Sequence, residues 1–375
     1  MNALSRDEQY MQRALDLAVQ GLGRVEPNPM VGAVVVRSDR IIGEGFHAYF
    51  GGPHAEVAAL EQASDNTRGA ELFVSLEPCC HWGKTPPCTD AVLNAGIRRV
   101  VAAVTDPFPE VAGRGLETLR QAGVETAVGV LEGKARRLNA AFFKRAKTGL
   151  PLVVAKWAMT LDGHMAAASG DSRWISSDDS RRRVHEFRRA CDAVVVGAGT
   201  ALRDEPSLTV RQAEPLPERG QPTRVILDGR LVIDPAKEPA RSARQAPVIV
   251  YTTPLALATQ ANRAEGLRQA GCELVPVGKA EGGVSLPAVL DDMGKRTWSR
   301  VLVEGGARLF GSLFAARLVD GVMIFVAPQI LGGAGALRPV AGTEGRRLAD
   351  AWPIADMSVE QVGPDLLIQG RVGEF

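Results

Sequence analysis

The chain has 375 residues, of which 45% are hydrophobic and 23% are charged, and its formal net charge is +1. This length allows two or three domains with real cores, and the balanced charge argues against a broad nucleic-acid-binding surface. Five cysteines give no paired disulfide framework, and no uninterrupted apolar run is long enough to span a bilayer, so we expect a cytoplasmic enzyme.

The N-terminal third alternates apolar strands with helices. Ser5 and Glu8 form a capping-box pattern that predicts a helix start, and Ser38-Asp39 predicts the turn of a hairpin. Strands are predicted over 31–36, 41–45, 71–76, 99–104 and 124–130, and helices over about 88–95, 116–122 and 134–147. This alternation, with a hairpin at one edge, indicates an α/β protein with a three-layer sandwich.

Metal-binding residue types cluster between the hairpin and the next helices. His54, Cys79 and Cys88 can hold one Zn²⁺ and leave the fourth tetrahedral position for water, as catalytic zinc sites do. Glu56 is the proton carrier that such a water needs. His54 and Glu56 are two residues apart, so they serve one centre only if it lies off a helix N-terminus, which 51–53 can supply.

A structural zinc site is the alternative interpretation of this cluster. In that case Cys80 or His81 would close the fourth position. Such a site has no use for Glu56 at this spacing, so the residues favour the catalytic interpretation.

The cluster resembles the H-x-E and P-C-x-x-C signature of zinc-dependent nucleobase deaminases, except that eight residues separate the two cysteines here. The longer insert, with His81, Lys84 and Thr85 inside it, resembles the deaminase half of the bifunctional riboflavin-biosynthesis deaminase/reductase family. The resemblance implies a cytidine-deaminase-like fold and a substrate pocket that includes Asn28, His47, His81, Lys84, Thr85 and Asp106. From the residues alone, Asn28 would cap a turn and His47 would lie in a surface loop.

One segment departs from this family. The family usually reads Asp-Pro-Asn-Pro where this chain has Asp106-Pro107-Phe108-Pro109. If that Asn touches the substrate, its contact is either missing here or replaced by stacking.

The second half begins after a linker at 148–151, which divides the chain into domains 1–149 and 150–375. Strands are predicted over 152–159, 193–196, 224–227, 248–251, 273–277 and 301–303, and helices over 181–189 and 307–315. The segment 197–199 has two glycines of a dinucleotide fingerprint but lacks the third glycine and the acidic ribose partner. Gly305 and Gly306 can bring backbone N–H groups to a cofactor pyrophosphate, although a tight turn with positive φ explains them equally well.

The order of motifs at 156–163, 174–176, 199–211 and 303–306 resembles the reductase half of the same family, a domain similar to dihydrofolate reductase. The resemblance implies cofactor contacts at Ala158, Trp174, Thr200 and Asp204, and substrate contacts at Ser172, Arg188, Leu208, Arg211 and Glu304. Of these, Ser172, Arg188 and Arg211 suit a 5′-phosphate, although the arginines of 181–189 would also suit a solvated face. Lys156 and Asp204 both remain as proton sources.

The resemblance implies a bifunctional enzyme, a zinc hydrolase joined to an NADP-dependent oxidoreductase, that acts in riboflavin biosynthesis. Zinc-bound hydroxide would deaminate a diaminopyrimidinone that carries a ribosylamino 5′-phosphate, and NADPH would then reduce the ribosyl group to a ribityl chain. We expect Zn²⁺ and NADPH as cofactors, a homo-oligomer, and neither nucleic acid nor membrane as a partner.

Three other functions are compatible with parts of the sequence. The first is a monofunctional nucleobase deaminase whose C-terminal half is a nucleotide-binding regulatory module. A tRNA-editing deaminase has the short Cys-x-x-Cys spacing and needs a basic surface that a net charge of +1 does not suggest. A non-enzymatic zinc scaffold would lack an exchangeable water on the metal.

Overall fold

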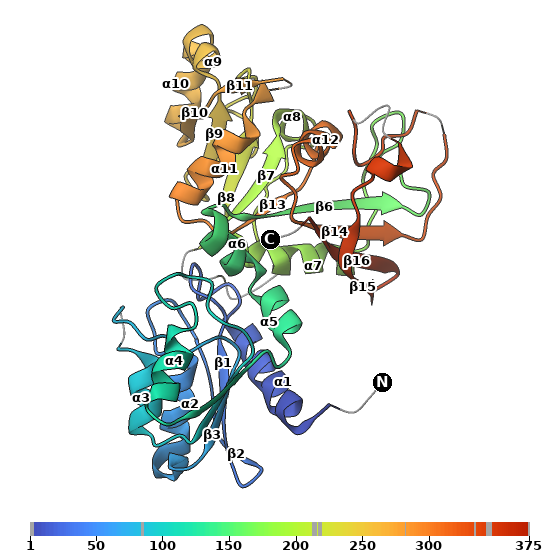
Figure 1. The fold of residues 1–375 in the computed structure, drawn as a ribbon. Coiled ribbons are helices and arrows are strands. Elements are labelled where there is room, and N and C mark those ends of the chain that lie inside the picture. Colours follow the sequence, from blue (N-terminus) through green and yellow to red (C-terminus); the bar gives the residue numbers. More distant parts are fainter. Residues whose placement is uncertain are drawn as a thin grey trace. The chain divides into compact units, whose positions relative to one another are not determined.

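The computed structural model describes residues 4–83, 86–211, 216, 220–281, 283–333, 335–342 and 347–373. The chain divides into two compact units, Met1–Thr148 and Gly149–Phe375. Each unit is an α/β structure built around its own sheet (Figure 1).

The first unit contains a five-stranded sheet with the order β2-β1-β3-β4-β5. Its strands are β1 Gly32–Arg37, β2 Arg40–Phe46, β3 Glu71–Val74, β4 Arg99–Ala102 and β5 Glu125–Val128. The predicted hairpin is confirmed, and Ser38 and Asp39 turn between its strands with φ values of 50° and 57°, as two-residue hairpin loops require. Because β3, β4 and β5 run parallel, the segments that follow β3 and β4 both begin at the carboxyl ends of the strands, on the same side of the sheet.

Helices cover both faces of this sheet. They are α1 Arg6–Ala18, α2 Ala55–Ala63, α3 Cys88–Asn94, α4 Arg114–Gln121, α5 Glu132–Leu138 and α6 Ala140–Thr148, with 3₁₀ turns at Val19–Gly21 and Ser64–Thr67. The predicted capping box at Ser5 and Glu8 is present. Apolar residues of α2, α3 and α4 form one core with the sheet, and those of α1, α5 and α6 form another on its opposite face. The three-layer sandwich is therefore confirmed.

The prediction of one helix over 134–147 is wrong, because the helix is interrupted at Asn139. This residue has φ −102° and ψ 24°, and it is 2% exposed. Its Oδ1 accepts a hydrogen bond from the Met30 N–H at 2.8 Å, and its Nδ2 donates to the Met30 carbonyl at 2.8 Å. These two bonds join segments that are 109 residues apart, so local periodicity does not reveal the interruption.

The second unit contains a nine-stranded sheet with the order β10-β9-β8-β7-β13-β6-β14-β16-β15. Its strands are β6 Leu152–Thr160, β7 Ala193–Gly197, β8 Thr223–Leu227, β9 Val248–Thr252, β10 Glu273–Pro276, β13 Arg300–Val303, β14 Gly321–Ala327, β15 Ile354–Val362 and β16 Asp365–Val372, beside a small ribbon of β11 Lys279–Ala280 and β12 Gly283–Val284. The strands from β10 to β14 pair in parallel, whereas β16 and β15 are antiparallel additions. The parallel strands other than β14 were predicted from the sequence, whereas the C-terminal hairpin of β15 and β16 was not.

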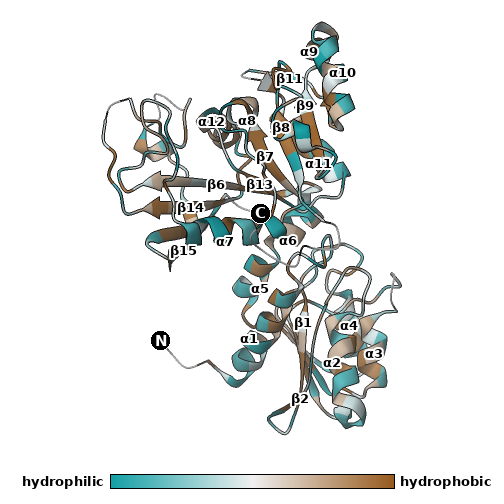
Figure 2. Ribbon diagram, turned by 180° about the vertical axis from the view of Figure 1, so that it is seen from behind, coloured by the Kyte–Doolittle hydropathy of each residue, from teal (hydrophilic) through white to brown (hydrophobic). Residues whose placement is uncertain are grey.

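The helices of the second unit also form two layers. They are α7 Asp178–Arg189, α8 Ala198–Asp204, α9 Pro254–Thr259, α10 Ala261–Ala270, α11 Leu286–Lys295 and α12 Ala307–Ala315, with 3₁₀ turns at Ala240–Ser242 and Leu348–Asp350. One core contains α11 and α12, and the other contains α8, α9 and α10. Strands such as β8 and β9 are largely apolar along their length, as parallel strands covered on both faces are (Figure 2). Within the described ranges, no helix is long and apolar enough to cross a membrane.

Candidate active sites

Three metal-binding side chains meet at one end of the first sheet. His54 is the N-cap residue of α2, Cys88 is the first residue of α3, and Cys79 follows β3. His54 Nδ1 lies 3.2 Å from Cys88 Sγ and 3.6 Å from Cys79 Sγ, and the three ligand atoms are within 4.8 Å of one another. Zinc–sulfur and zinc–nitrogen bonds in a tetrahedron place neighbouring ligands about 3.5 Å apart, so these residues fit a zinc ion.

The helix start at Cys88 also supports this cluster. The backbone N–H of Cys88 donates to Cys79 Sγ at 3.3 Å. Hydrogen bonds from Cys88 and from His54 outweigh burial and lower the pKa of Cys79 to about 4. The hydrogen bond with Cys79 in turn raises the pKa of His54. Cys79 is therefore favoured as a thiolate, the form of cysteine that binds metals, whereas the hydrogen bond with Cys79 and burial raise the pKa of Cys88.

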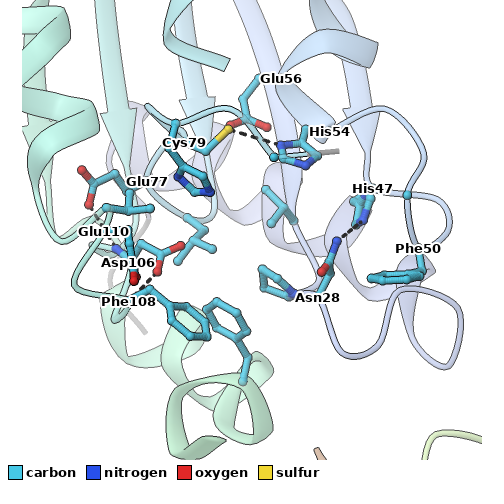
Figure 3. A pocket seen from close by; sticks show the side chains of 18 of the residues that line it. Asn28, His47, Phe50, His54, Glu56, Glu77, Cys79, Asp106, Phe108 and Glu110 are labelled. Atoms are coloured by element: carbon cyan, nitrogen blue, oxygen red, sulfur yellow. Dashed lines mark hydrogen bonds between the residues drawn. The ribbon is translucent and has the colours of Figure 1, made fainter. Parts of the chain in front are cut away.

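Glu56 lies in the first turn of α2, and its carboxyl group lines the cavity at the metal cluster. Figure 3 shows this side chain beside Cys79 and His54. Glu56 is 3% exposed, and burial raises its pKa to about 7. A carboxyl group with a pKa near neutrality can both accept and return a proton.

The structural-zinc interpretation needs a fourth protein ligand. In the part of the chain that the structure describes, the metal-binding cluster has three members, and neither Cys80 nor His81 belongs to it. His81 is exposed and lines the cavity instead. Lys84 and Thr85, two further predicted pocket residues, lie outside the described residues.

The cavity beside the cluster has a volume of about 400 Å³, which suits a small heterocyclic ligand. Asn28 and His47 both line it, and Asn28 Nδ2 lies 3.2 Å from His47 Nε2. His47 Nδ1 lies 3.0 Å from the Pro53 carbonyl, so the tautomer with a proton on Nδ1 leaves Nε2 to accept from Asn28. His47 is only 3% exposed, so its interpretation as a surface loop residue is wrong.

The opposite end of the cavity is formed by the segment after β4. Asp106 lines the cavity there, and its Oδ1 accepts a hydrogen bond from the Phe108 N–H at 2.8 Å. Burial raises the pKa of Asp106 to about 6. Asp106 therefore presents a polar group beside the aromatic ring of Phe108 (Figure 3).

Glu77 is a site residue that was not predicted from the sequence. It is 3% exposed and lines the cavity two residues before Cys79. Its carboxylate accepts backbone N–H bonds from Asp106 at 3.1 Å, Gly113 at 2.9 Å and Leu116 at 3.2 Å. Glu77 thus ties the segment that carries Cys79 to the segment that carries Asp106. Its position directly after the predicted apolar strand 71–76 is the sequence feature that could have identified this acidic residue as a site residue.

A second group of predicted residues meets in the sheet of the second unit. Val303 at the end of β13 pairs with Ala155 of β6, so the next residues, Glu304 and Lys156, are neighbours. Lys156 Nζ lies 4.0 Å from Glu304 Oε2, and the guanidinium of Arg188 donates to both carboxylate oxygens of Glu304. Burial would raise the pKa of Glu304, but the charge and hydrogen bonds of Arg188, with the charge of Lys156, hold it at about 2.

His185 belongs to the same buried group and was not predicted. It lies one turn before Arg188 on α7 and is 6% exposed. Burial, and then the charges of Arg188 and Arg211, lower the pKa of His185 to about 4. Its imidazole is therefore neutral at physiological pH and adds no charge to the Arg188 and Glu304 pair.

The two predicted cofactor glycines lie beside a predicted threonine. Gly305 and Gly306 have φ values of 149° and 90°, which other residues rarely adopt. A Cβ atom added at either position would lie 3.4 Å from Thr200 Oγ1. Because Thr200 follows β7 and the glycines follow β13, its neighbour, these residues share one edge of the parallel sheet.

The remaining predicted reductase residues are more dispersed. Trp174 is 69% exposed, and the Arg181 guanidinium lies 4.4 Å from its ring centroid. Asp204 is the last residue of α8, and its backbone carbonyl accepts from Arg173 at 2.7 Å. Leu208 is buried, Arg211 is exposed, and Ser172 and Ala158 are half-buried.

Comparisons with known proteins assign the two halves to known families. The model of the RibD C-terminal domain matches residues 151–368, and the model of the cytidine and deoxycytidylate deaminase zinc-binding region matches residues 4–104. The riboflavin biosynthesis protein RibD of Aquifex aeolicus is 40% identical over 362 residues, which cover 96% of this chain and 97% of that protein. RibD of Escherichia coli is 39% identical over 373 residues, 97% of this chain and 98% of its own length.

Solved structures show the same likeness across the whole chain. Acinetobacter baumannii RibD in its first form has a TM-score of 0.85 and 35% identity, with coverage of 98% of this chain and 99% of that one. A diaminohydroxyphosphoribosylaminopyrimidine deaminase/5-amino-6-(5-phosphoribosylamino)uracil reductase from Thermotoga maritima has a TM-score of 0.81 and 38% identity, with the same coverage.

Proposed function

Because this chain belongs to the RibD family and is a bifunctional deaminase/reductase of riboflavin biosynthesis, we propose that its two units divide the two reactions between them. Residues 1–149 would form the deaminase domain, and residues 150–375 the reductase domain. The proposal is supported by the two family models, of which one matches within each unit.

For the first unit, we extend the substrate named for the Thermotoga relative, a diaminopyrimidine that carries a ribosylamino phosphate. The observation that carries this proposal is that Glu56 lines one cavity together with His54 and Cys79, two of the three residues of the metal cluster. Zinc, when it is bound by His54, Cys79 and Cys88, supplies a hydroxide near neutral pH. Glu56 takes up the proton of the attacking water and returns it to the departing ammonia.

The other cavity residues hold the substrate. Asn28, His47 and Asp106 contact the polar edge of the pyrimidine, because all three place polar groups in the cavity. His81, with Lys84 and Thr85, binds the pyrimidine or the phosphate of the substrate. Glu77 acts indirectly, since its three backbone hydrogen bonds hold Asp106 in place relative to Cys79.

The second unit binds a nicotinamide cofactor, and we propose NADPH. Gly305 and Gly306 bring backbone N–H groups to the pyrophosphate, and Thr200 lies beside them. Ala158, Trp174 and Asp204 provide further cofactor contacts. A bound nicotinamide cofactor would supply the hydride that reduces C1′ of the opened ribose, while the protein positions both molecules and supplies a proton.

Glu304, Lys156 and Leu208 contact the ribosyl part of the substrate. We choose Lys156 rather than Asp204, the last residue of α8, as the proton source. Burial lowers the pKa of the Lys156 ammonium group and so favours proton release. Arg188 cannot both hold Glu304 and grip a phosphate with the same donors. We therefore assign the 5′-phosphate to Arg211 and Ser172, and Arg188 to the orientation of Glu304.

We also propose that the protein is a cytoplasmic homo-oligomer. Strand β15 is an edge strand that pairs with β16, and Ile354, Met357 and Val359 along it are 39%, 62% and 55% exposed. An edge with such large apolar side chains suits a second copy of this chain. Sedimentation of the Met357→Glu variant beside the unchanged protein tests this proposal. If the two proteins have equal molecular masses in solution, β15 does not form the interface.

The experiment that tests the proposed function follows both half-reactions on the zinc-loaded protein. The diaminopyrimidinone ribosyl phosphate is supplied with and without NADPH, while ammonia release and NADPH oxidation are recorded. Ammonia without NADPH, followed by oxidation only after deamination, is the expected result. Ammonia release without NADPH oxidation would mean that the second unit is a nucleotide-binding module and not a reductase. The absence of both signals would overturn the assigned substrate.

A further inference from the structure

The deaminase cavity has an aromatic wall that the proposed chemistry does not use. Phe108 and Phe142 both line the cavity, and their ring centroids are 5.3 Å apart with the planes inclined by 59°. Phe142 belongs to α6, whereas Phe108 follows β4. The wall therefore joins two separate segments of the first unit at the substrate cavity.

The position of Phe108 is fixed by its backbone. Its N–H donates to Asp106 Oδ1 at 2.8 Å, and its carbonyl accepts from the N–H groups of Val111 at 2.9 Å and Ala112 at 3.0 Å. The half-buried ring packs against Phe142 on one side. Little conformational freedom is left to lose when a ligand binds, so the ring is preorganised for contact.

The wall lies away from the reacting groups. In Figure 3, Phe108 projects into the cavity below Asp106, while Glu56, Cys79 and His54 lie at the opposite end. The nucleophile attacks an aromatic ring carbon perpendicular to the ring plane, so Glu56 and the metal ligands approach one face of the heterocycle. The other face is left for a contact that excludes water.

We infer that Phe108 is a specificity-determining residue of the deaminase site, whose ring contacts the face of the pyrimidine turned away from Glu56. This inference rests on the proposed function. A phenyl ring recognises a flat conjugated surface, such as the face of a pyrimidine. Asp106, hydrogen-bonded to the Phe108 N–H, contacts the polar edge of the same heterocycle.

The test compares KM and kcat for ammonia release in Phe108→Leu, Phe108→Tyr and Phe143→Leu. Phe143 is the matched control, because it is buried in the same aromatic cluster but does not line the cavity. Phe108→Leu keeps an apolar side chain and removes the aromatic face. Stacking of an aromatic side chain on a base predicts at least about a fivefold rise in KM with kcat little changed.

Two comparisons decide the inference. Phe108→Tyr keeps the aromatic face and should keep KM within about twofold of the unchanged protein, and Phe143→Leu should do the same. An unchanged KM in Phe108→Leu, or an equal rise in Phe143→Leu, would overturn the role of Phe108. Zinc content and the reductase rate of each variant report whether it has folded. Failure of the unchanged protein to release ammonia would instead count against the proposed function.

Discussion

Arg188 and Glu304 form a forked ion pair across 116 residues of sequence, in which the guanidinium Nε and Nη2 donate to the two carboxylate oxygens. Their side chains are 11% and 8% exposed, and the third guanidinium nitrogen of Arg188 donates to the Thr209 carbonyl at 2.8 Å. A buried carboxylate that loses its cationic partner destabilises the folded state, because its charge is then left uncompensated. The pair therefore fixes Glu304 and leaves Arg188 with a structural partner at each nitrogen.

Replacement of Arg188 by Met should destabilise the second unit. The variant leaves Glu304 buried with Lys156 at 4.0 Å as its remaining cation, so we expect a loss of about 3 kcal/mol in the free energy of unfolding. Urea unfolding followed by tryptophan fluorescence measures it. Arg182→Met is the control on the same helix, because Arg182 pairs with Asp179 at the surface and should cost less than about 1 kcal/mol. Similar losses in the two variants would contradict this account.

The acid stability of the second unit should depend on Glu304. Its pKa is lowered from 4.5 to about 2, so the ionised group stabilises the fold above pH 4.5, and this stability disappears as the pH falls through about 2. The difference corresponds to about 3 kcal/mol. As the pH is lowered from 6 to 2, the free energy of unfolding should therefore fall less steeply in Glu304→Gln than in the unchanged protein. Parallel curves for the two proteins would contradict the lowered pKa of Glu304.

Removal of zinc should separate the two activities. The three ligands all belong to the first unit, so a chelator should abolish ammonia release and leave NADPH-dependent reduction of the deaminated substrate intact. Cys88→Ser should lower the zinc content in the same way. Cys191→Ser is the matched control, because Cys191 is a buried cysteine outside the cluster. Loss of both activities on chelation would contradict the assignment of zinc to the deaminase unit alone.

The zinc cluster could be predicted from sequence because two of its three ligands lie at helix starts that the local sequence indicates. His54 and Glu56 can share one centre only at a helix N-terminus, and the structure places the start of α2 between them. Cys88 likewise begins α3, directly after Pro86 and Pro87, which favour a helix start at this point. Residue type and spacing therefore restricted the arrangement before any tertiary contact was known.

Other features depend on contacts that spacing does not record. Strand β15 is exposed along most of its length, so no alternation of apolar and polar residues marks it. Asp365 in the same hairpin accepts hydrogen bonds from the hydroxyl groups of Ser177 and Ser180, at 2.8 Å and 2.6 Å, although about half the chain separates them. The pairing of Arg188 with Glu304 is equally remote, which is why the basic helix suggested a phosphate site instead.

Loss of the Asn139 side chain should destabilise the first unit. Asn139→Ala removes both partners of the buried Met30 backbone, and each unsatisfied group costs about 1–3 kcal/mol. We expect a clear decrease in the melting temperature of the first unit, measured by calorimetry. Asn94→Ala, at the exposed end of α3, is the control and should leave the melting temperature nearly unchanged.

Replacement of Glu56 by Gln should remove deamination without removing the metal. The amide has nearly the size of the carboxyl group but cannot take up the proton of the attacking water, so ammonia release should fall by a factor of about 10²–10⁴. Zinc content and the reductase rate should stay unchanged, because Glu56 is outside the ligand cluster and the reductase lies in the other unit. Glu61→Gln, an exposed position on the same helix, should keep full activity. If Glu56→Gln still deaminates near the original rate, another group carries the proton.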